Sequence, residues 1–207
     1  GAALPSIVIT TPEGAVLSSA DPEIDQILSE MLGRAVRLTS EPPAERFREA
    51  DRRPLDGAEE QIRREPLALG APAGGFFDYA PLHLLTTATL EHLQARYPAG
   101  RLEPRRFRPN LLLAPAGASG LVEHGWLGQS FALGALGLRV IDPTPRCLVP
   151  TLAQGDLPRD PGILRAITAH SSAPSVTLAP GVVFAAVAGV YAAVTRPGTV
   201  RVGEDVR

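Results

Sequence analysis

One cysteine is present in the 207-residue sequence, and its surroundings could activate it. Cys147 follows Arg146 within the stretch PTPRCLVPTL, residues 143–152. A neighbouring guanidinium favours the thiolate, which is the form that ligates soft metals and carries sulfur. The prolines on both sides restrict the backbone and would fix the direction of the sulfur. The stretch therefore favours a ligand or a sulfur carrier, although an unplaced lone cysteine more often packs as a small hydrophobic residue.

The composition excludes several kinds of chemistry. All 20 basic residues are arginine, so no Schiff-base lysine and no phosphate-loop lysine is present. A single cysteine excludes an internal disulfide and a multi-cysteine zinc site, and it fits a reducing cytoplasm. A net charge of −2 gives no general attraction to nucleic acid or to an anionic membrane. The longest apolar run, residues 182–194, is too short to span a membrane and indicates buried strand.

A second stretch with chemical potential is RRFRPNLLL, residues 105–113. We expect a strand here, from which Arg106 and Arg108 leave on the same face as Asn110. Two planar, permanently charged forks beside an amide suit an oxyanion such as phosphate. A surface ladder of salt bridges explains the same residues equally well.

A third stretch lies where a buried strand over residues 82–86 meets a helix over residues 87–97. Thr87 and Thr89 open this helix, and free N–H groups with hydroxyls at a helix N-terminus can bind an anion. Ordinary capping by Thr87 would also explain the residue choice, so this motif is weak by itself.

Other titratable residues are weaker candidates. Asp78, Glu123 and His124 could donate protons near such a site, but each type is more often found at the surface or in a cap. His83 lies within an apolar strand, where a satisfied core histidine is the better interpretation.

The elements that carry these residues predict a mixed, mainly β fold. Short strands separated by Gly and Pro turns favour a closed or nearly closed barrel with a few peripheral helices over a doubly wound sheet. Helices are expected from Asp21 to Gly33 and from Asp160 through Ile167. Further strands are expected over residues 7–10, 35–38, 136–141, 182–195 and 199–202.

The segment of residues 41–75 is rich in Pro, Arg and Glu and poor in large apolar residues. It predicts a solvated loop between an N-terminal β/α part, residues 1–40, and the β core, residues 76–207. Its arginines, Arg52, Arg53, Arg63 and Arg64, could instead form an anion-binding lid, which we favour less.

Five motifs occur in an order that resembles a known family. The sequence resembles the MOSC domain, the molybdenum-cofactor sulfurase C-terminal domain, over residues 76–206. Within that family it looks like a bacterial stand-alone member that resembles the mitochondrial amidoxime-reducing component. Residues 1–40 resemble the variable N-terminal part of bacterial members. The motifs are FFDYAPLHLLTTATL, RFRPNLLL, VEHGWLGQSFALGALGLRV, PTPRCLVPTL and GVYAAVTRPGTVRVGEDV.

The resemblance implies a β-barrel that holds molybdenum cofactor, a molybdopterin. It implies that Cys147 ligates molybdenum through sulfur, and that Arg108, Asn110 and Thr89 lie near the pterin. Beside it, the residues themselves suggest that Arg106, Arg108 and the Thr87–Thr89 junction would meet the phosphate tail, and that Arg146 would favour the thiolate.

Two departures from the family pattern stand out. The usual first strand, with a Tyr-Pro-Val-Lys-Ser-like sequence, does not precede Gly1, which leaves open both truncation at the start and retention of the cofactor. Residues 169–187 form a long apolar segment that we expect to be an insertion at the mouth of the pocket.

Three functions remain open at this point. The first is an oxidoreductase that removes oxygen from N-oxygenated small molecules, with Cys147 as metal ligand and a separate electron-donor protein. The second is a sulfur-transfer protein with a persulfide on Cys147. The third is a non-redox pathway enzyme or binding module that reuses the pocket.

Overall fold

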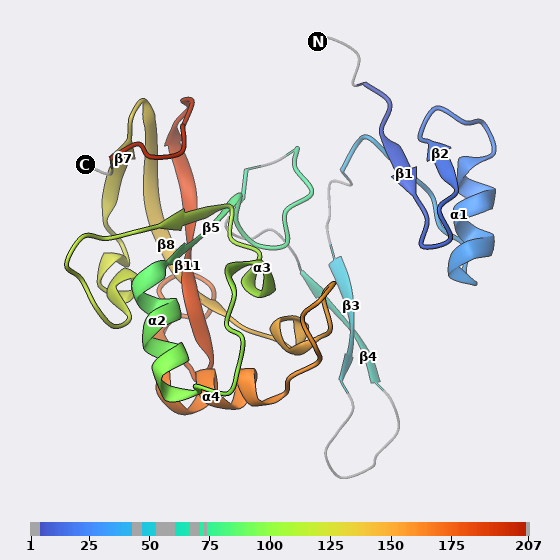
Figure 1. Ribbon diagram of the computed structural model, residues 1–207. Helices are drawn as coiled ribbons and strands as arrows, with labels where there is room; N and C mark the ends of the chain where they lie inside the picture. Colours follow the sequence, from blue (N-terminus) through green and yellow to red (C-terminus); the bar gives the residue numbers. More distant parts are fainter. Residues whose placement is uncertain (1–4, 43–46, 53–60, 67–70, 73, 206–207) are drawn as a thin grey trace. The chain divides into compact units, whose positions relative to one another are not determined.

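The computed structural model describes residues 5–42, 47–52, 61–66, 71–72 and 74–205. The chain divides into two compact units, residues 1–46 and 47–207. We describe each unit by itself (Figure 1).

The N-terminal unit is a hairpin followed by one helix. Strand β1 (Val8–Thr10) pairs antiparallel with β2 (Val16–Ser18), and helix α1 spans Ile24–Leu32. The helix begins later than expected, but the Asp21 carboxylate still accepts a hydrogen bond from the Glu23 N–H at 2.9 Å. Gly33 ends the helix as predicted, in the left-handed region at φ 63°.

The strand expected over residues 35–38 is wrong. The N–H groups of Val36 and Leu38 donate to side chains of α1, Ser29 Oγ at 2.9 Å and Asp25 Oδ1 at 2.8 Å. These backbone donors are therefore satisfied by the preceding helix and not by a neighbouring strand.

The loop expected over residues 41–75 is also wrong in part. Strand β3 (Phe47–Arg52) pairs antiparallel with β4 (Gln61–Pro66) in a hairpin. Dense charge with few large apolar residues hides a strand from pattern reasoning, because the usual alternation of apolar and polar residues is missing. Arg53 lies outside the described residues, and the idea of an anion-binding lid remains an expectation.

The larger unit is built on a five-stranded sheet. The strand order is β6-β5-β11-β8-β7; β5 and β6 are parallel, and the other pairs are antiparallel. Shifts in register between β11 and β8 bend both strands, and the sheet curls into half a barrel (Figure 1). The prediction of a mainly β fold with few helices is confirmed. The strands are β5 (Leu82–Thr86), β6 (Leu111–Leu113), β7 (Ser130–Leu133), β8 (Leu136–Pro145) and β11 (Val187–Arg196).

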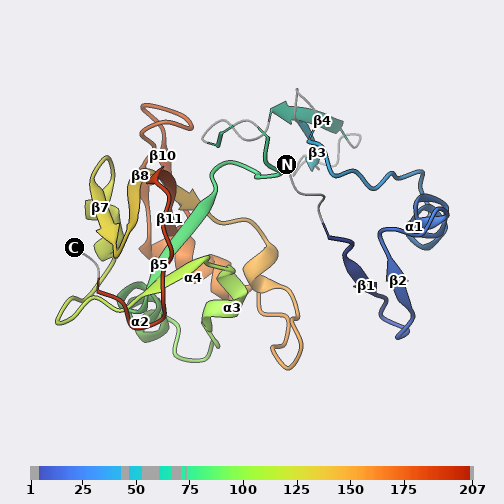
Figure 2. The same cartoon turned by 90° about the horizontal axis from the view of Figure 1, so that it is seen from above.

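Two hydrophobic cores lie on opposite faces of this sheet. Leu84 on β5 packs in one core with β8 residues such as Leu138, and the next residue, Leu85, packs in the other with the helices. Figure 1 and Figure 2 show the helices on one side of the central strands. They are α2 (Thr87–Arg96), α3 (Pro104–Phe107) and α4 (Gly162–His170).

The remaining elements correct three expectations. Residues 105–113 are not one strand, because α3 occupies their first part and only β6 is strand. The apolar run at residues 182–195 contains two strands, and residues 199–202 form none. The smaller elements are η1 (Val122–Trp126), η2 (Val149–Thr151), β9 (Ala173–Pro174) and β10 (Val183–Phe184).

Gly189 permits the bend in β11. Its φ is +87°, and a Cβ at this position would collide with the His83 ring and with the Leu84 carbonyl. Glycine is the residue that adopts this conformation without a steric penalty. The bend lets the Ala188 carbonyl reach His83 Nε2 at 3.2 Å.

Candidate functional site

Cys147 lies two residues beyond the end of β8 with an exposed side chain. Both of its neighbours are fixed through the main chain. The Arg146 N–H donates to the Ala186 carbonyl at 2.7 Å. The Leu148 carbonyl accepts from the N–H and the hydroxyl of Thr151 at 2.9 and 2.7 Å. The thiol is thus accessible but carried by an ordered backbone.

The Arg146 side chain turns inward beside this thiol. Its guanidinium donates to the Phe107 carbonyl at 2.9 Å and lies 5.7 Å from the centre of the Phe107 ring. Burial lowers the pKa of Arg146 below its ordinary value, while Tyr191 and Cys147 oppose that shift. The Nε–H is buried and has no hydrogen-bond partner among the described residues. A desolvated cation with one unused donor therefore lies next to the cysteine.

Arg106 is placed differently from the prediction. It belongs to helix α3 and not to a strand, and its side chain is 0% exposed. Its guanidinium donates to four main-chain carbonyls, those of Arg101, Pro150, Leu152 and Pro158. An exposed oxyanion surface shared by Arg106 and Arg108 is therefore wrong, because the two residues lie in different surroundings.

Arg108 ends helix α3 in an unusual backbone conformation. Its φ is 54°, and it is the non-glycine residue with positive φ in the described part of the chain. Such a conformation is unfavourable for a residue with a Cβ and is enriched at functional sites. The side chain is exposed and forms no hydrogen bond or ion pair within the described ranges. Among the described residues near Cys147, the Arg108 guanidinium therefore remains available for a ligand.

Asn110 locks the start of β6 to β5. Its side-chain oxygen accepts from the His83 N–H at 2.7 Å, and its own N–H donates to the His83 carbonyl at 2.9 Å. His83 is 8% exposed, as expected of a core histidine. Burial, reinforced by the charge of Arg146, lowers the pKa of His83 to about 4, so the ring is neutral at pH 7.

A row of buried polar side chains leads along β8 toward Cys147. Asp142 and Thr144 alternate along the strand, Arg146 follows its last residue, and Tyr191 of β11 lies opposite Asp142. Asp142 and Thr144 are buried, and Thr144 Oγ1 has no partner among the described residues. These polar residues alternate with prolines in the sequence Asp-Pro-Thr-Pro-Arg. Because proline is uncommon within strands, the sequence does not predict that β8 continues through this stretch.

Thr87 and Thr89 belong to a second cluster. Thr86, not Thr87, caps α2 by accepting from the Thr89 N–H at 3.0 Å. The hydroxyls of Thr86 and Thr89 both donate to Oε2 of Glu123 at 2.7 Å. Glu123 is 0% exposed, so a carboxylate of the protein already lies at this helix N-terminus. The Glu123 carboxyl therefore already uses the two hydroxyl donors that a phosphate would need at this position.

The structure thus gathers Arg146, Arg108, Asn110 and His83 around the elements next to Cys147. In the described ranges, no hydrogen bond or ion pair joins them to the cluster of Thr86, Thr89 and Glu123. Thr87 is half-buried at the edge of that second cluster.

The other expected proton donors are dispersed. Asp78 is exposed, whereas His124 is half-buried with a pKa lowered by burial. A hollow of about 340 Å³ is lined by Ala132, Gly134, Glu204 and Asp205, none of which belongs to either cluster.

Two further features are absent from the described part of the chain. It contains no group of three or more His, Cys, Asp or Glu side chains suited to a metal ion. None of its helices has the length and apolar character needed to cross a lipid bilayer.

Comparison with known protein families gives a match to the larger unit. The family model described as MOSC domain matches residues 73–207, which includes every residue of the two clusters. A search of the curated proteins finds no match.

Proposed function

Because the chain belongs to the MOSC domain family, we propose that it binds molybdenum cofactor through Cys147 and acts with it as an oxidoreductase. The proposed substrates are small N-oxygenated molecules. Removal of one oxygen atom from such a molecule consumes a pair of electrons and two protons and releases water. The single cysteine leaves no set of thiolates for an iron–sulfur cluster, so we propose a separate electron-donor protein.

The observation that carries the proposal is the set of unused groups around Cys147. The exposed thiol lies beside half-buried Arg146, whose buried Nε–H has no partner among the described residues. Arg108 is held in a strained conformation, and its exposed guanidinium has no ion-pair partner among the described residues. A soft sulfur ligand together with free cationic donors fits a metal in an organic cofactor with an anionic tail.

Each residue has a distinct role in this proposal. The Cys147 thiolate would ligate the metal, and the buried charge of Arg146 would stabilise that thiolate. Arg108 would meet the anionic tail, with Asn110 nearer the pterin. When bound, the cofactor supplies a metal centre that exchanges an oxygen atom and electrons with the substrate. His83 stays neutral beside Arg146, so it adds no second positive charge there.

Metal analysis tests the proposal directly. Protein purified from a host that makes the cofactor should contain about one molybdenum per chain, because one thiolate ligand is present. Cys147→Ser should lose the metal while its circular dichroism spectrum stays unchanged, since the side chain is exposed. Absence of molybdenum from the unaltered protein would contradict cofactor binding, and full retention in Cys147→Ser would contradict the ligand role.

Arg108 offers a test in which binding and stability separate. We expect Arg108→Gly and Arg108→Ala to weaken cofactor binding by about 1.5–3 kcal/mol, because each removes a charge-assisted contact. Arg108→Gly should also raise the free energy of unfolding by up to about 1 kcal/mol, since glycine tolerates positive φ. Cofactor titration and thermal unfolding measure the two effects.

Arg105→Ala is the matched control for Arg108. Arg105 is an exposed arginine of the same helix, engaged in ion pairs with Glu103 and Asp156. The substitution Arg105→Ala should leave the affinity for the cofactor unchanged. If the Arg108 variants bind the cofactor as tightly as the unaltered protein does, Arg108 does not contact the cofactor.

The exposure of Cys147 also favours sulfur transfer as a second candidate. An accessible thiol can carry a persulfide, and Arg146 would stabilise it. The intact mass of unreduced protein should then include one added sulfur atom that is absent from Cys147→Ser. Turnover retained in Cys147→Ala would instead favour a non-redox enzyme or binding module.

A further inference from the structure

Arg106 has the largest fully buried side chain of the described residues, yet it is charged. No carboxylate among these residues forms an ion pair with it; its partners are carbonyl oxygens. A buried charge requires a polar environment to replace its water, and here main-chain dipoles supply it. This placement indicates that the surrounding main chain is arranged to accept hydrogen bonds from the Arg106 guanidinium.

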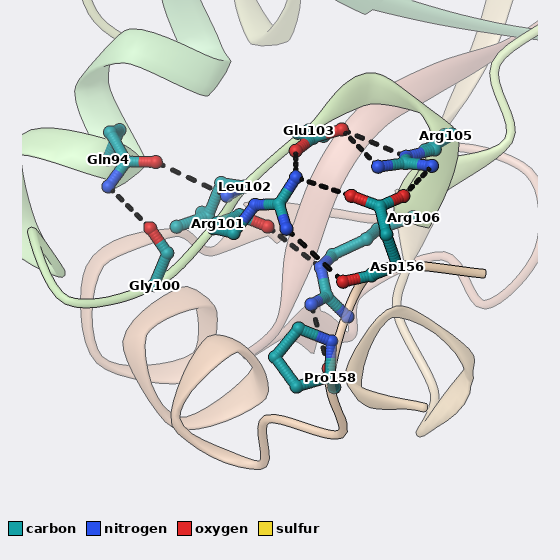
Figure 3. A network of polar contacts seen from close by, with 9 residues as sticks. All are labelled: Gln94, Gly100, Arg101, Leu102, Glu103, Arg105, Arg106, Asp156 and Pro158. Atoms are coloured by element: carbon teal, nitrogen blue, oxygen red, sulfur yellow. Dashed lines mark hydrogen bonds and ion pairs between the residues drawn. The ribbon is translucent and has the colours of Figure 1, made fainter. Parts of the chain in front are cut away.

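The carbonyls lie on both limbs of the loop that follows Cys147. Nη1 donates to Pro150 and Leu152 on the outgoing limb, each at 3.1 Å. Nη2 donates to Pro158 on the returning limb at 2.9 Å, and Nε donates to Arg101 at 2.7 Å. Figure 3 shows the guanidinium of Arg106 pointing toward Pro158. One side chain therefore closes the loop of residues 150–158.

This loop determines where Cys147 can lie. The bonds to Pro150 and Leu152 fix η2, and Thr151 of η2 holds the Leu148 carbonyl, one residue after the cysteine. On the other side, the next residue of α3, Phe107, accepts from Arg146, one residue before the cysteine. Helix α3 thus fixes the chain on both sides of Cys147.

We propose that Arg106 is a positioning residue that holds the Cys147 segment in a fixed relation to Arg108, without itself contacting the ligand. The same short helix ends at Arg108. Helix α3 would therefore position both Cys147, the proposed sulfur ligand, and Arg108, the proposed anion-binding cation. Only this last consequence rests on the proposed cofactor; the positioning of the loop does not.

Arginine is specifically suited to this task. Its planar fork has five N–H donors, which reach acceptors in several directions at once, whereas lysine has three donors on one nitrogen. The neighbouring surface network of Arg101, Glu103, Arg105 and Asp156 also joins α3 to the loop (Figure 3). These ion pairs are exposed, and exposed pairs contribute little, so Arg106 dominates the attachment.

The experiment uses cofactor-free protein and the natural single cysteine. Hydrogen exchange should show amides of residues 148–158 protected in the unaltered protein and at least about tenfold less protected in Arg106→Gln and Arg106→Lys. A nitroxide label on Cys147 should change from an immobilised to a mobile spectrum in the same variants. Strand β8 should keep its protection.

Asp156→Ala and Arg105→Ala are the controls, because they remove surface ion pairs and leave Arg106 intact. They should alter neither the label nor the protection of the loop. Unchanged spectra and protection in the Arg106 variants would overturn the proposal, as would an equal loss of protection in β8, which would indicate a general role in stability. Should no Arg106 variant fold, the unaltered protein decides, because fast exchange of residues 148–158 in the native state would refute a clamped loop.

The outcome does not depend on the metal. A mobile label in Arg106→Gln with no molybdenum in any sample would support the positioning role and contradict the proposed cofactor. Normal molybdenum binding by the unlabelled proteins, together with an equally immobile label in every labelled, cofactor-free variant, would do the reverse.

Discussion

Asp142→Ala should lower the free energy of unfolding by about 3–4 kcal/mol, because it removes a buried acceptor shared by many donors. Asp142 is 0% exposed and accepts from Val176, Thr177 and Ser175 at 2.8–3.2 Å, and also from the Leu178 N–H. The Tyr79 hydroxyl donates to it at 3.2 Å. Denaturant titration at pH 7 measures the loss.

The same carboxylate should make stability depend on acid. Burial opposes its charge, but hydrogen bonds from Leu178, Thr177 and Val176 outweigh burial and lower the pKa of Asp142 below its ordinary value. Its contribution is therefore present at pH values well above the ordinary aspartate pKa of 3.8, and it is lost as the pH falls through the lower folded-state pKa.

Two variants bracket the Asp142 prediction. Asp142→Asn keeps one carbonyl acceptor and should lose about half as much stability as the alanine variant. Asp78→Ala changes an exposed aspartate and should stay within about 0.5 kcal/mol of the unaltered protein. A loss below about 1 kcal/mol in Asp142→Ala would mean that this carboxylate does not hold residues 175–178 in place.

His83→Gln should remove a pH dependence of stability that lies in a separate window. Burial first, and the charge of Arg146 second, lower the pKa of His83 from 6.5 to about 4. On acidification, His83 of the unfolded chain is therefore protonated near pH 6.5, whereas His83 of the folded chain is protonated only near pH 4. Stability is complete above that window and falls within it by up to about 3 kcal/mol.

Denaturant titrations between pH 4 and 7 measure the slope. The unaltered protein should lose stability steadily on acidification, and His83→Gln should flatten most of that loss. His92 also has a pKa lowered by burial but is more exposed, so His92→Gln should flatten the slope less. Equal pH dependence of the free energy of unfolding in His83→Gln and the unaltered protein would show that folding does not lower the pKa of His83.

Local patterns predict the strand–helix unit of residues 82–96 well. A short apolar run followed by threonines gives β5 and α2 almost at their observed bounds. Helix α3 is missed because it is a single turn that ends with Arg108 at positive φ. Pro104 at its start is the available signal. Strand β8 runs farther than predicted, through two prolines that pair where the register shifts.

The candidate site is predictable in its residue types but not in their roles. The order of motifs draws attention to Cys147, Arg108 and Asn110, and their roles toward a cofactor stay predictions. The placement of Arg106 depends on carbonyls 44 to 52 residues away, which no local pattern reports. Likewise, Glu123 reaches the hydroxyls of Thr86 and Thr89 from 34 to 37 residues away.

The central place of β11 has a consequence for how the chain reaches its fold. Val190 pairs with Leu84, more than 100 residues earlier, and with Pro143 on the other side. Because loops of this length must close before the pairing is rewarded, we expect folding to be slow for a chain of this size. During synthesis, β5 and β8 would emerge before their shared partner, and the sheet could be completed only after β11 has left the ribosome.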